Sequence, residues 1–300
     1  AEILLGNKSF CNLSEVDLLK FKDDSGGLDR ALFLAGRANY RQTLVNLDDG
    51  ILQRTWHENN EYLRLCGVGL TGIATREDLN SYDYKRFKNL AIHGAYSMAD
   101  ELGTQRPKNV TTIKPSGTLS KIMDTTEGCH KPMGKYIFNN VNFSINDPML
   151  PKLREAGYHV VLNPTDEHNA IVTFPVAWEN IRFDKEGDLY VNKESAIEQL
   201  TRYKLLMDSY VEQNCSITVS YKEDEVPAIR DWLKSNWSSY VGVSFLPITN
   251  TTYEYLPQEV VTEARYKEYV AQLTDVDFSD TDSTHEIEND ECESGVCPVK

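Results

Sequence analysis

The sequence lacks long apolar runs and has comparatively little positive charge. No stretch of the 300 residues approaches the roughly 18 consecutive apolar residues of a transmembrane helix. Residues 1–20 also lack the basic start and apolar block of a secretory signal. The 31 basic residues are outweighed by 46 acidic ones, which gives a net charge of −15. Because affinity for polynucleotides depends on Lys and Arg, we expect no polynucleotide partner. Since neither an apolar run nor a secretory signal is found, we also expect a cytoplasmic protein without a membrane partner.

Paired metal-binding cysteines are absent as well. The six cysteines are Cys11, Cys66, Cys129, Cys215, Cys292 and Cys297. None has the Cys-x-x-Cys spacing of a structural zinc site, so no metal site is expected from them. The thiols are therefore interpreted as reduced, buried or redox-active.

Helical and strand-like patterns alternate along the chain. Apolar residues recur at helical spacing over 28–47, 83–102 and 195–213. Runs rich in Val, Ile, Thr and Phe occupy 170–176, 216–219 and 241–246. This alternation predicts an α/β fold with parallel strands.

The composition changes near the C-terminus. Residues 274–294 contain no Lys or Arg and nine acidic residues, Asp275, Asp277, Asp280, Asp282, Glu286, Glu288, Asp290, Glu291 and Glu293. Such a segment buries too little apolar surface to fold alone, which predicts a flexible acidic tail over 274–300. Cys292 and Cys297 on this tail have the placement of a dithiol shuttle, with incidental thiols on a disordered terminus as the alternative.

Two further motifs suggest chemistry. In Thr111-Thr-Ile-Lys-Pro-Ser-Gly-Thr-Leu-Ser120, a β-branched run meets a turn rich in hydroxyl groups. Backbone N–H groups and hydroxyls that converge in such a turn suit a phosphate, although Ser and Thr that cap a strand-to-helix turn give the same pattern. Glu127-Gly-Cys-His130 suits either a metal or nucleophile pair or, as we favour, a satisfied turn with a buried thiol.

Together these segments resemble a known family. Ala1–Val16 resembles the sequence directly after the radical cysteine of adenosylcobalamin-dependent ribonucleoside-triphosphate reductases, which typically reads Asn-Pro-Cys-Ala-Glu-Ile. Further resembling stretches are 64–72, 111–120, 172–176, 213–218, 243–247 and the terminal dithiol. The resemblance implies that residues 1–273 form the second half of a ten-stranded α/β barrel with cobalamin-facing segments, and that a disordered acidic tail follows.

The resemblance also implies roles for individual residues. Glu2 corresponds to the general base for the substrate 3′-hydroxyl, and Cys11 to one of the two thiols that reduce the 2′ position. Cys292 and Cys297 correspond to the shuttle that thioredoxin or a similar dithiol reduces. The substrate phosphates would be held by Ser116, Gly117, Thr118 and Ser120. Adenosylcobalamin would supply the radical for the reduction of ribonucleoside triphosphates.

The radical cysteine is not part of this sequence, which begins with Ala1. We therefore expect a fragment that is incomplete without the N-terminal half of the enzyme, whether an intein, a split gene or a truncated record explains the boundary. Two alternatives stay open: a large-subunit fragment of a diiron-type ribonucleoside-diphosphate reductase, and a non-catalytic nucleotide-binding or redox-relay remnant. The ten-residue interval from Ala1 to Cys11 favours the cobalamin type.

Overall fold

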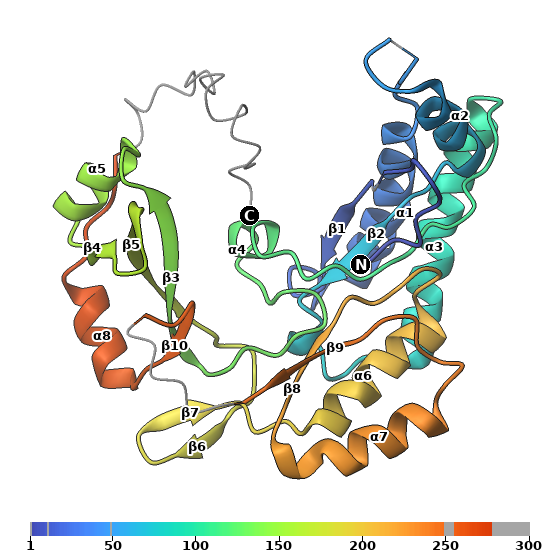
Figure 1. The fold of residues 1–300 in the computed structure, drawn as a ribbon. Helices are drawn as coiled ribbons and strands as arrows, with labels where there is room; N and C mark the ends of the chain where they lie inside the picture. Colours follow the sequence, from blue (N-terminus) through green and yellow to red (C-terminus); the bar gives the residue numbers. More distant parts are fainter. Residues whose placement is uncertain (1, 11, 49, 249–254, 278–300) are drawn as a thin grey trace. The chain divides into compact units, whose positions relative to one another are not determined.

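The computed structural model describes residues 2–10, 12–48, 50–248 and 255–277 (Figure 1). The chain forms two compact units. Unit 1 comprises Ala1–Pro132, Asn180–Arg182 and Asn192–Thr251, and unit 2 comprises Met133–Glu179, Phe183–Val191 and Thr252–Lys300. The predicted domain 1–273 therefore includes all of unit 1 and part of unit 2. In the part of the chain described, no helix is both long and apolar enough to span a membrane.

Unit 1 alternates strands and helices. Its strands are β1 (Ser14–Asp17), β2 (Val68–Thr71), β8 (Thr218–Tyr221) and β9 (Ser244–Pro247). Its α-helices are α1 (Ser25–Gln42), α2 (Arg54–Leu63), α3 (Ser81–Glu101), α4 (Leu119–Ile122), α6 (Ala196–Ser209) and α7 (Val226–Ser235). Two 3₁₀ turns lie at Ile73–Thr75 and Glu223–Glu225.

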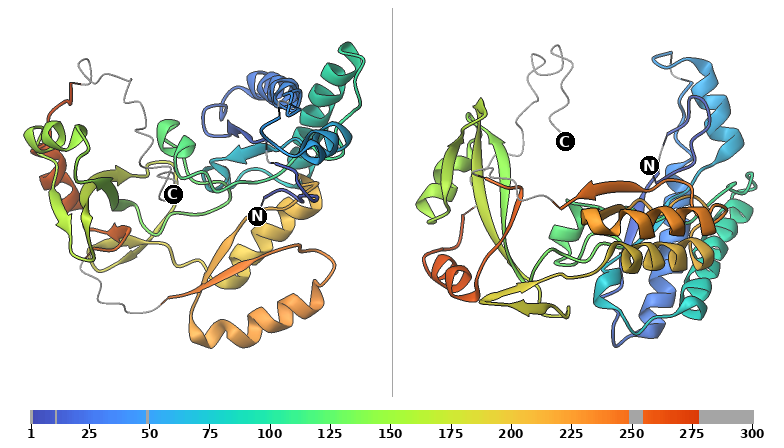
Figure 2. Two further views of the ribbon diagram at one scale, coloured as in Figure 1. Left: turned by 45° about the horizontal axis from the view of Figure 1, so that its top comes forward. Right: turned by 60° about the horizontal axis from the view of Figure 1, so that its bottom comes forward.

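Parallel pairing links the strands of unit 1 in chain order. β1 pairs with β2, single parallel bridges join Val68 to Thr111 and Ile113 to Cys215, and β8 pairs with β9. Right-handed crossovers between parallel strands in chain order place their helices on one side of the sheet. Figures 1 and 2 show α1 and α3 packed side by side against β1 and β2.

The side chains between the strands and the helices α1, α3 and α6 form the main core. One continuous cluster includes Val16, Leu70, Ile113, Cys215 and Ile217 from the strand side and Leu32, Phe87, Leu200 and Tyr203 from the helices. These positions alternate along the strands, as expected when one face of a sheet packs on helices. The core therefore fixes which residues of each strand point to the opposite face.

Local signals explain where the long helices begin. Asn80 and Asp83 form a capping box at α3, as do Ser195 and Glu198 at α6, because each side chain bonds a backbone N–H that the helix leaves unpaired. Gly103, with φ of 62°, follows α3 in the left-handed conformation expected of a C-terminal cap. The predicted helix over 83–102 is thus confirmed within two residues.

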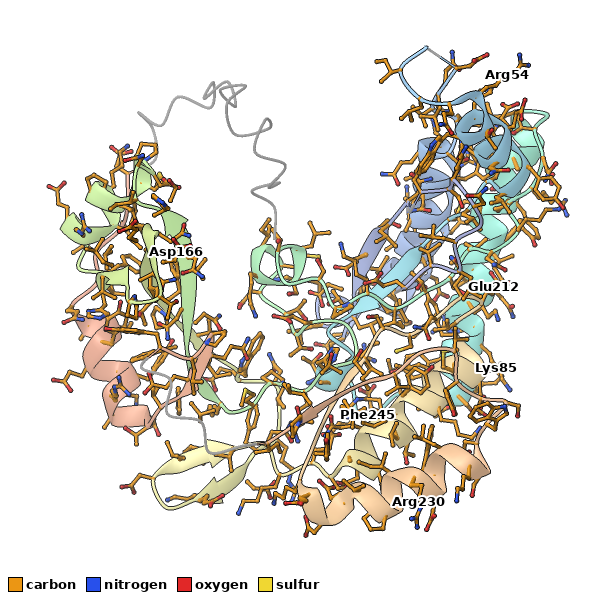
Figure 3. All side chains as sticks on the ribbon, viewed as in Figure 1. Arg54, Lys85, Asp166, Glu212, Arg230 and Phe245 are labelled. Atoms are coloured by element: carbon orange, nitrogen blue, oxygen red, sulfur yellow. The ribbon has the colours of Figure 1, made fainter. Side chains whose placement is uncertain are left out.

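Two helices end earlier than their apolar spacing predicts. α1 ends at Gln42 rather than residue 47, and the carbonyl of Thr43 accepts a hydrogen bond from Asn60 Nδ2 at 2.7 Å. α6 ends at Ser209 rather than residue 213, because the following residues pair with the neighbouring segment. Glu212, labelled in Figure 3, accepts from the Val110 N–H at 2.8 Å. Tertiary hydrogen bonds therefore set both ends.

Unit 2 is built on an antiparallel sheet with the order β10–β3–β5–β4. Its strands are β3 (Tyr136–Ser144), β4 (Val160–Asn163), β5 (Asp166–Ala177), β6 (Asp184–Glu186), β7 (Leu189–Val191) and β10 (Gln258–Val260), and its helices are α5 (Met149–Glu155) and α8 (Glu263–Ala271). The expected strand over 170–176 exists, but its predicted parallel pairing is wrong. The two residues between β4 and β5 are too few for a parallel crossover, so they form a hairpin.

Candidate functional site

The face of the unit 1 sheet opposite its helices is polar. It carries Glu15, Asp17, Gly69, Thr71, Thr112 and Lys114, which we call the polar face. The strands of a parallel sheet buried on both sides are usually apolar throughout. A sheet with one apolar and one polar face therefore points to a site on the polar side.

Strand register arranges the polar face in rows. Glu15 pairs with Gly69, and the bridge between Val68 and Thr111 sets Gly69 beside Thr112. The bridge at Ile113 extends this row to Asn214. In the next row, Asp17 pairs with Thr71, and Lys114 follows from the same register. Residues from three distant parts of the sequence thus share the polar face.

The N-terminal segment is anchored on the first row. The Glu2 carbonyl accepts hydrogen bonds from Thr112 Oγ1 at 2.7 Å and from the Asn214 N–H at 3.1 Å. Gln213 Oε1 accepts from the Leu4 N–H at 3.2 Å, and the Ile3 side chain is buried. The backbone, rather than the Glu2 carboxylate, therefore holds this predicted general base at the polar face.

The turn at Thr125–Gly128 covers the second row. Thr71 Oγ1 donates to the Thr126 carbonyl at 2.6 Å and accepts from the Gly128 N–H at 3.0 Å. Gly72 has φ of 73°, and a Cβ there would lie 2.5 Å from Thr125 Oγ1 and 2.7 Å from Asp17 Oδ1. Burial raises the pKa of Asp17, whose Oδ1 accepts from the Leu19 N–H at 3.0 Å.

The predicted phosphate loop follows directly from the polar face. Ser116 is buried, and its Oγ accepts from the Leu119 N–H at 3.2 Å, while the Ser120 hydroxyl donates to the Ser116 carbonyl. Both serines therefore stabilise the turn, as the capping interpretation expects. Gly117 and Thr118 are exposed, and no acceptor for their N–H groups is found among the described residues. These two donors are the part of the loop open to an anion.

Glu15 is the most unusual group of the polar face. Both of its carboxylate oxygens are buried, and neither has a partner at hydrogen-bonding geometry in the described ranges. Burial raises the pKa of Glu15 to about 7, against the opposing effects of Lys114 and the Ser116 hydroxyl. Its neighbour Gly69 has no side chain, so the space beside Glu15 over the sheet is open. A Cβ at position 69 would occupy part of this space, 3.4 Å from Glu15 Cγ.

The Glu127–His130 motif is a satisfied turn. His130 Nε2 accepts from the Thr218 N–H at 3.0 Å, and its Nδ1 lies 3.3 Å from the Glu127 carbonyl. Cys129 Sγ lies 3.6 Å from Cys215 Sγ, both fully buried, and this thiol contact, with His130 and Arg202, lowers the pKa of Cys129. Across the described ranges, no cluster of three or more His, Cys, Asp or Glu residues is arranged to hold a metal ion.

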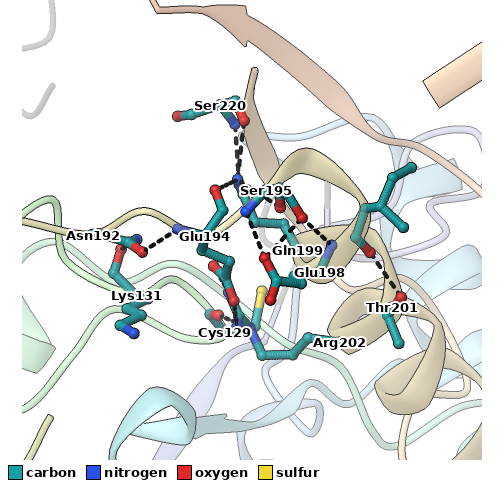
Figure 4. A network of polar contacts seen from close by, with 11 residues as sticks. Cys129, Lys131, Asn192, Glu194, Ser195, Glu198, Gln199, Thr201, Arg202 and Ser220 are labelled. Atoms are coloured by element: carbon teal, nitrogen blue, oxygen red, sulfur yellow. Dashed lines mark hydrogen bonds and ion pairs between the residues drawn. The ribbon is translucent and has the colours of Figure 1, made fainter. Parts of the chain in front are cut away.

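Arg202 holds this turn against α6. Its Nε donates to the Cys129 carbonyl at 2.7 Å, and its Nη2 pairs with Glu194 Oε2 at 2.7 Å (Figure 4). The side chains of Arg202 and Glu194 are both largely buried, so the pair is protected from solvent. The turn therefore covers the second row from a fixed position.

The structure places only some of the predicted site residues. Glu2 and the Ser116–Ser120 loop lie on or next to the polar face of unit 1. Cys11, Cys292 and Cys297 lie outside the described residues. The sequence analysis missed Glu15, Asp17 and Asn214. The alternation Ser14-Glu-Val-Asp17, next to Cys11, was the signal that could have identified the two carboxylates.

Unit 2 contains a separate cavity of about 790 Å³. Its lining combines aromatic rings with charged groups: Phe138, Tyr158, His159, Tyr255, Tyr269, Arg154, Arg265, Glu259 and Glu268. Tyr269 fixes one wall, since its hydroxyl donates to the Thr173 carbonyl and accepts from the His159 N–H. Its size and its mixture of aromatic and polar side chains are typical of a small-molecule site.

Known proteins give this geometry a context. No protein-family model matches the chain. Over its whole length the chain is 25% identical to the adenosylcobalamin-dependent ribonucleoside-triphosphate reductase of Levilactobacillus brevis and 26% identical to that of Lactobacillus acidophilus. It covers 44% of each relative, so it spans less than half of their length. The resemblance predicted from the sequence is confirmed.

A solved structure shows the same fold. A crystal structure of a B12-dependent (class II) ribonucleotide reductase superimposes with a TM-score of 0.78 at 22% identity. The match covers 91% of this chain and 42% of that one. The α/β fold is therefore confirmed as one that occurs within a class II reductase.

Proposed function

We propose that this chain is the C-terminal catalytic part of a ribonucleotide reductase that converts ribonucleoside triphosphates to 2′-deoxyribonucleoside triphosphates with adenosylcobalamin. The observation that carries the proposal is the anchoring of Glu2 on Thr112 and Asn214, directly before the loop at Lys114–Ser120. This arrangement brings the residue matched to the general base close to the residues matched to the phosphate loop. The names of the relatives point to the same reaction.

In this proposal each residue acts on a defined part of the substrate. The N–H groups of Gly117 and Thr118 bind phosphate oxygens. The Glu2 carboxylate accepts the 3′-hydroxyl proton while a thiyl radical removes the 3′-hydrogen. Cys11 and a second thiol give up two electrons and two protons as the 2′-hydroxyl leaves as water, and they form a disulfide. Cys292 and Cys297 then reduce this disulfide by exchange and are themselves reduced by thioredoxin or a similar dithiol.

The cavity of unit 2 suits the cofactor in chemical character. Cobalamin held there would supply the radical chemistry of the reaction. Phe138, Tyr158 and Tyr269 offer flat apolar surface to a corrin ring, and Arg154 and Arg265 offer donors to its polar side chains. The cavity lies within residues 1–273, for which the resemblance implies cobalamin-facing segments.

The N-terminal half of the enzyme is the proposed partner. The relatives are more than twice as long as the matched region, and the expected radical cysteine would directly precede Ala1. We assign to that half the radical cysteine and the second active-site thiol.

The test is to join the chain to an N-terminal half that ends in Asn-Pro-Cys and to measure deoxyribonucleotide formation by chromatography. We expect product from ribonucleoside triphosphates only when both adenosylcobalamin and a dithiol are present. Replacing Cys292 and Cys297 by Ser should abolish turnover with thioredoxin but not with a small dithiol, because only re-reduction needs the shuttle. Absence of product from a folded, joined enzyme under all conditions would contradict the proposal.

A further inference from the structure

The carboxyl group of Glu15 is buried on the polar face, and none of the described residues is its hydrogen-bond partner. Loss of water from a carboxylate is costly unless hydrogen bonds or charges replace it. Its two oxygens have no such bond in the part of the chain described. A buried carboxyl group without a hydrogen bond lowers the stability of the fold. At a predicted site, such a group is therefore a candidate for a functional role.

The position of Glu15 directs it toward the phosphate loop. It begins the row that runs over Gly69 to Thr112, and the chain continues from Thr112 to Lys114 and Ser116. Gly69 has no side chain to separate the carboxyl group from this strand. The nearby groups that act on Glu15 are the Lys114 ammonium and the Ser116 hydroxyl. Asp17 lies on the same face of the same strand, and Glu2 lies at the far end of the row.

The phosphate loop presents different charges to an anion in the two protonation states of Glu15. Ionised Glu15 attracts Lys114 and the Ser116 hydroxyl, so the positive charge is neutralised and a negative charge lies near the site. Neutral Glu15 leaves the full charge of Lys114 to a phosphate. Ionisation therefore weakens phosphate binding, and protonation strengthens it.

We propose that Glu15 is a positioning residue of the phosphate loop, which sets, through Lys114 and Ser116, the charge and the hydroxyl donor that the loop presents to a triphosphate. This inference rests on the proposed function and adds to it a residue that the family resemblance did not assign. It explains why a carboxylate is buried beside a site for an anion. The raised pKa of Glu15 places the change between the two states near neutral pH.

The experiment measures tripolyphosphate binding to the full chain by calorimetry at pH 6 and pH 8. The ratio of the dissociation constants of the unchanged chain and Glu15→Gln cancels the ionisation of the ligand itself. We expect Glu15→Gln to bind about tenfold more tightly at pH 8 and nearly equally at pH 6. Glu58→Gln, an exposed change of the same kind on α2, should leave both values unaltered.

Two further measurements separate this role from a structural one. In a Lys114→Met background, Glu15→Gln should lose most of its effect at pH 8, because the carboxyl group acts through Lys114. Carbon-13 NMR of the glutamate side chains should show Glu15 titrating near neutral pH, with a midpoint that rises when tripolyphosphate is added. An ordinary midpoint near 4.5, or equal binding by both chains at pH 8, would overturn the inference.

The outcome is distinguishable from that of the proposed function. Deoxyribonucleotide formation by the joined enzyme without any effect of Glu15 on binding would overturn this inference alone. A pH-dependent effect of Glu15 on binding without deoxyribonucleotide formation would overturn the proposed reaction alone.

Discussion

The two faces of the unit 1 sheet are formed by the same strands but differ in the side chains that they bury. On the helix face, side chains such as Leu70 and Ile113 are fully buried in one apolar cluster. On the polar face, Glu15 and Asp17 are also withdrawn from solvent, yet each has a carboxylate oxygen without a partner among the described residues. The first face stabilises the fold. The second holds groups in states that cost stability, as expected of a functional site.

The largest expected difference between the faces is in turnover. In the joined enzyme, Glu2→Gln should lower kcat by about 100-fold, because the amide cannot accept the 3′-hydroxyl proton. Thermal stability should not change, since Glu2 is anchored through its backbone carbonyl. Steady-state kinetics beside Glu58→Gln would measure this effect. Turnover close to normal would remove Glu2 from the proposed mechanism.

On the helix face, the expected effect is on stability instead. Leu70→Ala should lower the free energy of unfolding by about 3 kcal/mol, because it leaves a cavity in the main core. Leu34→Ala, at an exposed position of α1, is the matched control and should cost less than about 1 kcal/mol. Denaturant unfolding measures both. Equal losses from the two changes would contradict the distinction between core and surface leucines.

Gly72 tests the contact between the polar face and its covering turn. Gly72→Ala should lower the free energy of unfolding by about 2 kcal/mol, since the new Cβ would clash with Thr125 and Asp17. Gly103 also has a positive φ, but a Cβ there would have no atom of the described residues within 4 Å. Gly103→Ala should therefore cost only about 1 kcal/mol. If the two losses are equal, the close packing at Gly72 is not present.

The smallest expected effect is the pH dependence that Glu15 gives to stability. Because its pKa is raised to about 7 in the folded chain, the folded state keeps a proton that the unfolded state releases above about pH 4.5. Stability is therefore lost as the pH rises from 4.5 to 7. Glu15→Gln should raise the free energy of unfolding by about 1 kcal/mol at pH 8, a value reduced for partial exposure, and by almost nothing at pH 4.5. Unfolding curves at both pH values would measure it, and a pH-independent difference would contradict the assignment.

Much of the fold could be predicted from local signals. Apolar spacing located α1, α3 and α6, and the runs at 216–219 and 241–246 overlap β8 and β9. The pairing of the strand at 170–176 was not predictable in the same way. A β-branched run does not show whether its neighbour is parallel, and here the short β4–β5 connection decided the matter.

The residues of the candidate site could also be predicted only in part from the sequence. Glu2 and the Ser116–Ser120 loop were predicted through resemblance, because their motifs are continuous in the sequence. Asn214 was not, since its place beside Thr112 depends on the long-range bridge between Ile113 and Cys215. For Ser116 and Ser120 the sequence left a phosphate-binding role and a capping role open, and their hydroxyls stabilise the turn itself.

The sequence by itself determined the strand alternation, the helix caps and the family resemblance, since each depends on residues within a few positions of one another. The tertiary structure alone decided that Glu15 lies one row from Lys114, although 99 positions separate them along the chain. That proximity follows from strand register, which long-range backbone hydrogen bonds set, and from Gly69, whose missing side chain leaves the intervening space open. The burial that raises the pKa of Glu15 arises only when these segments pack together.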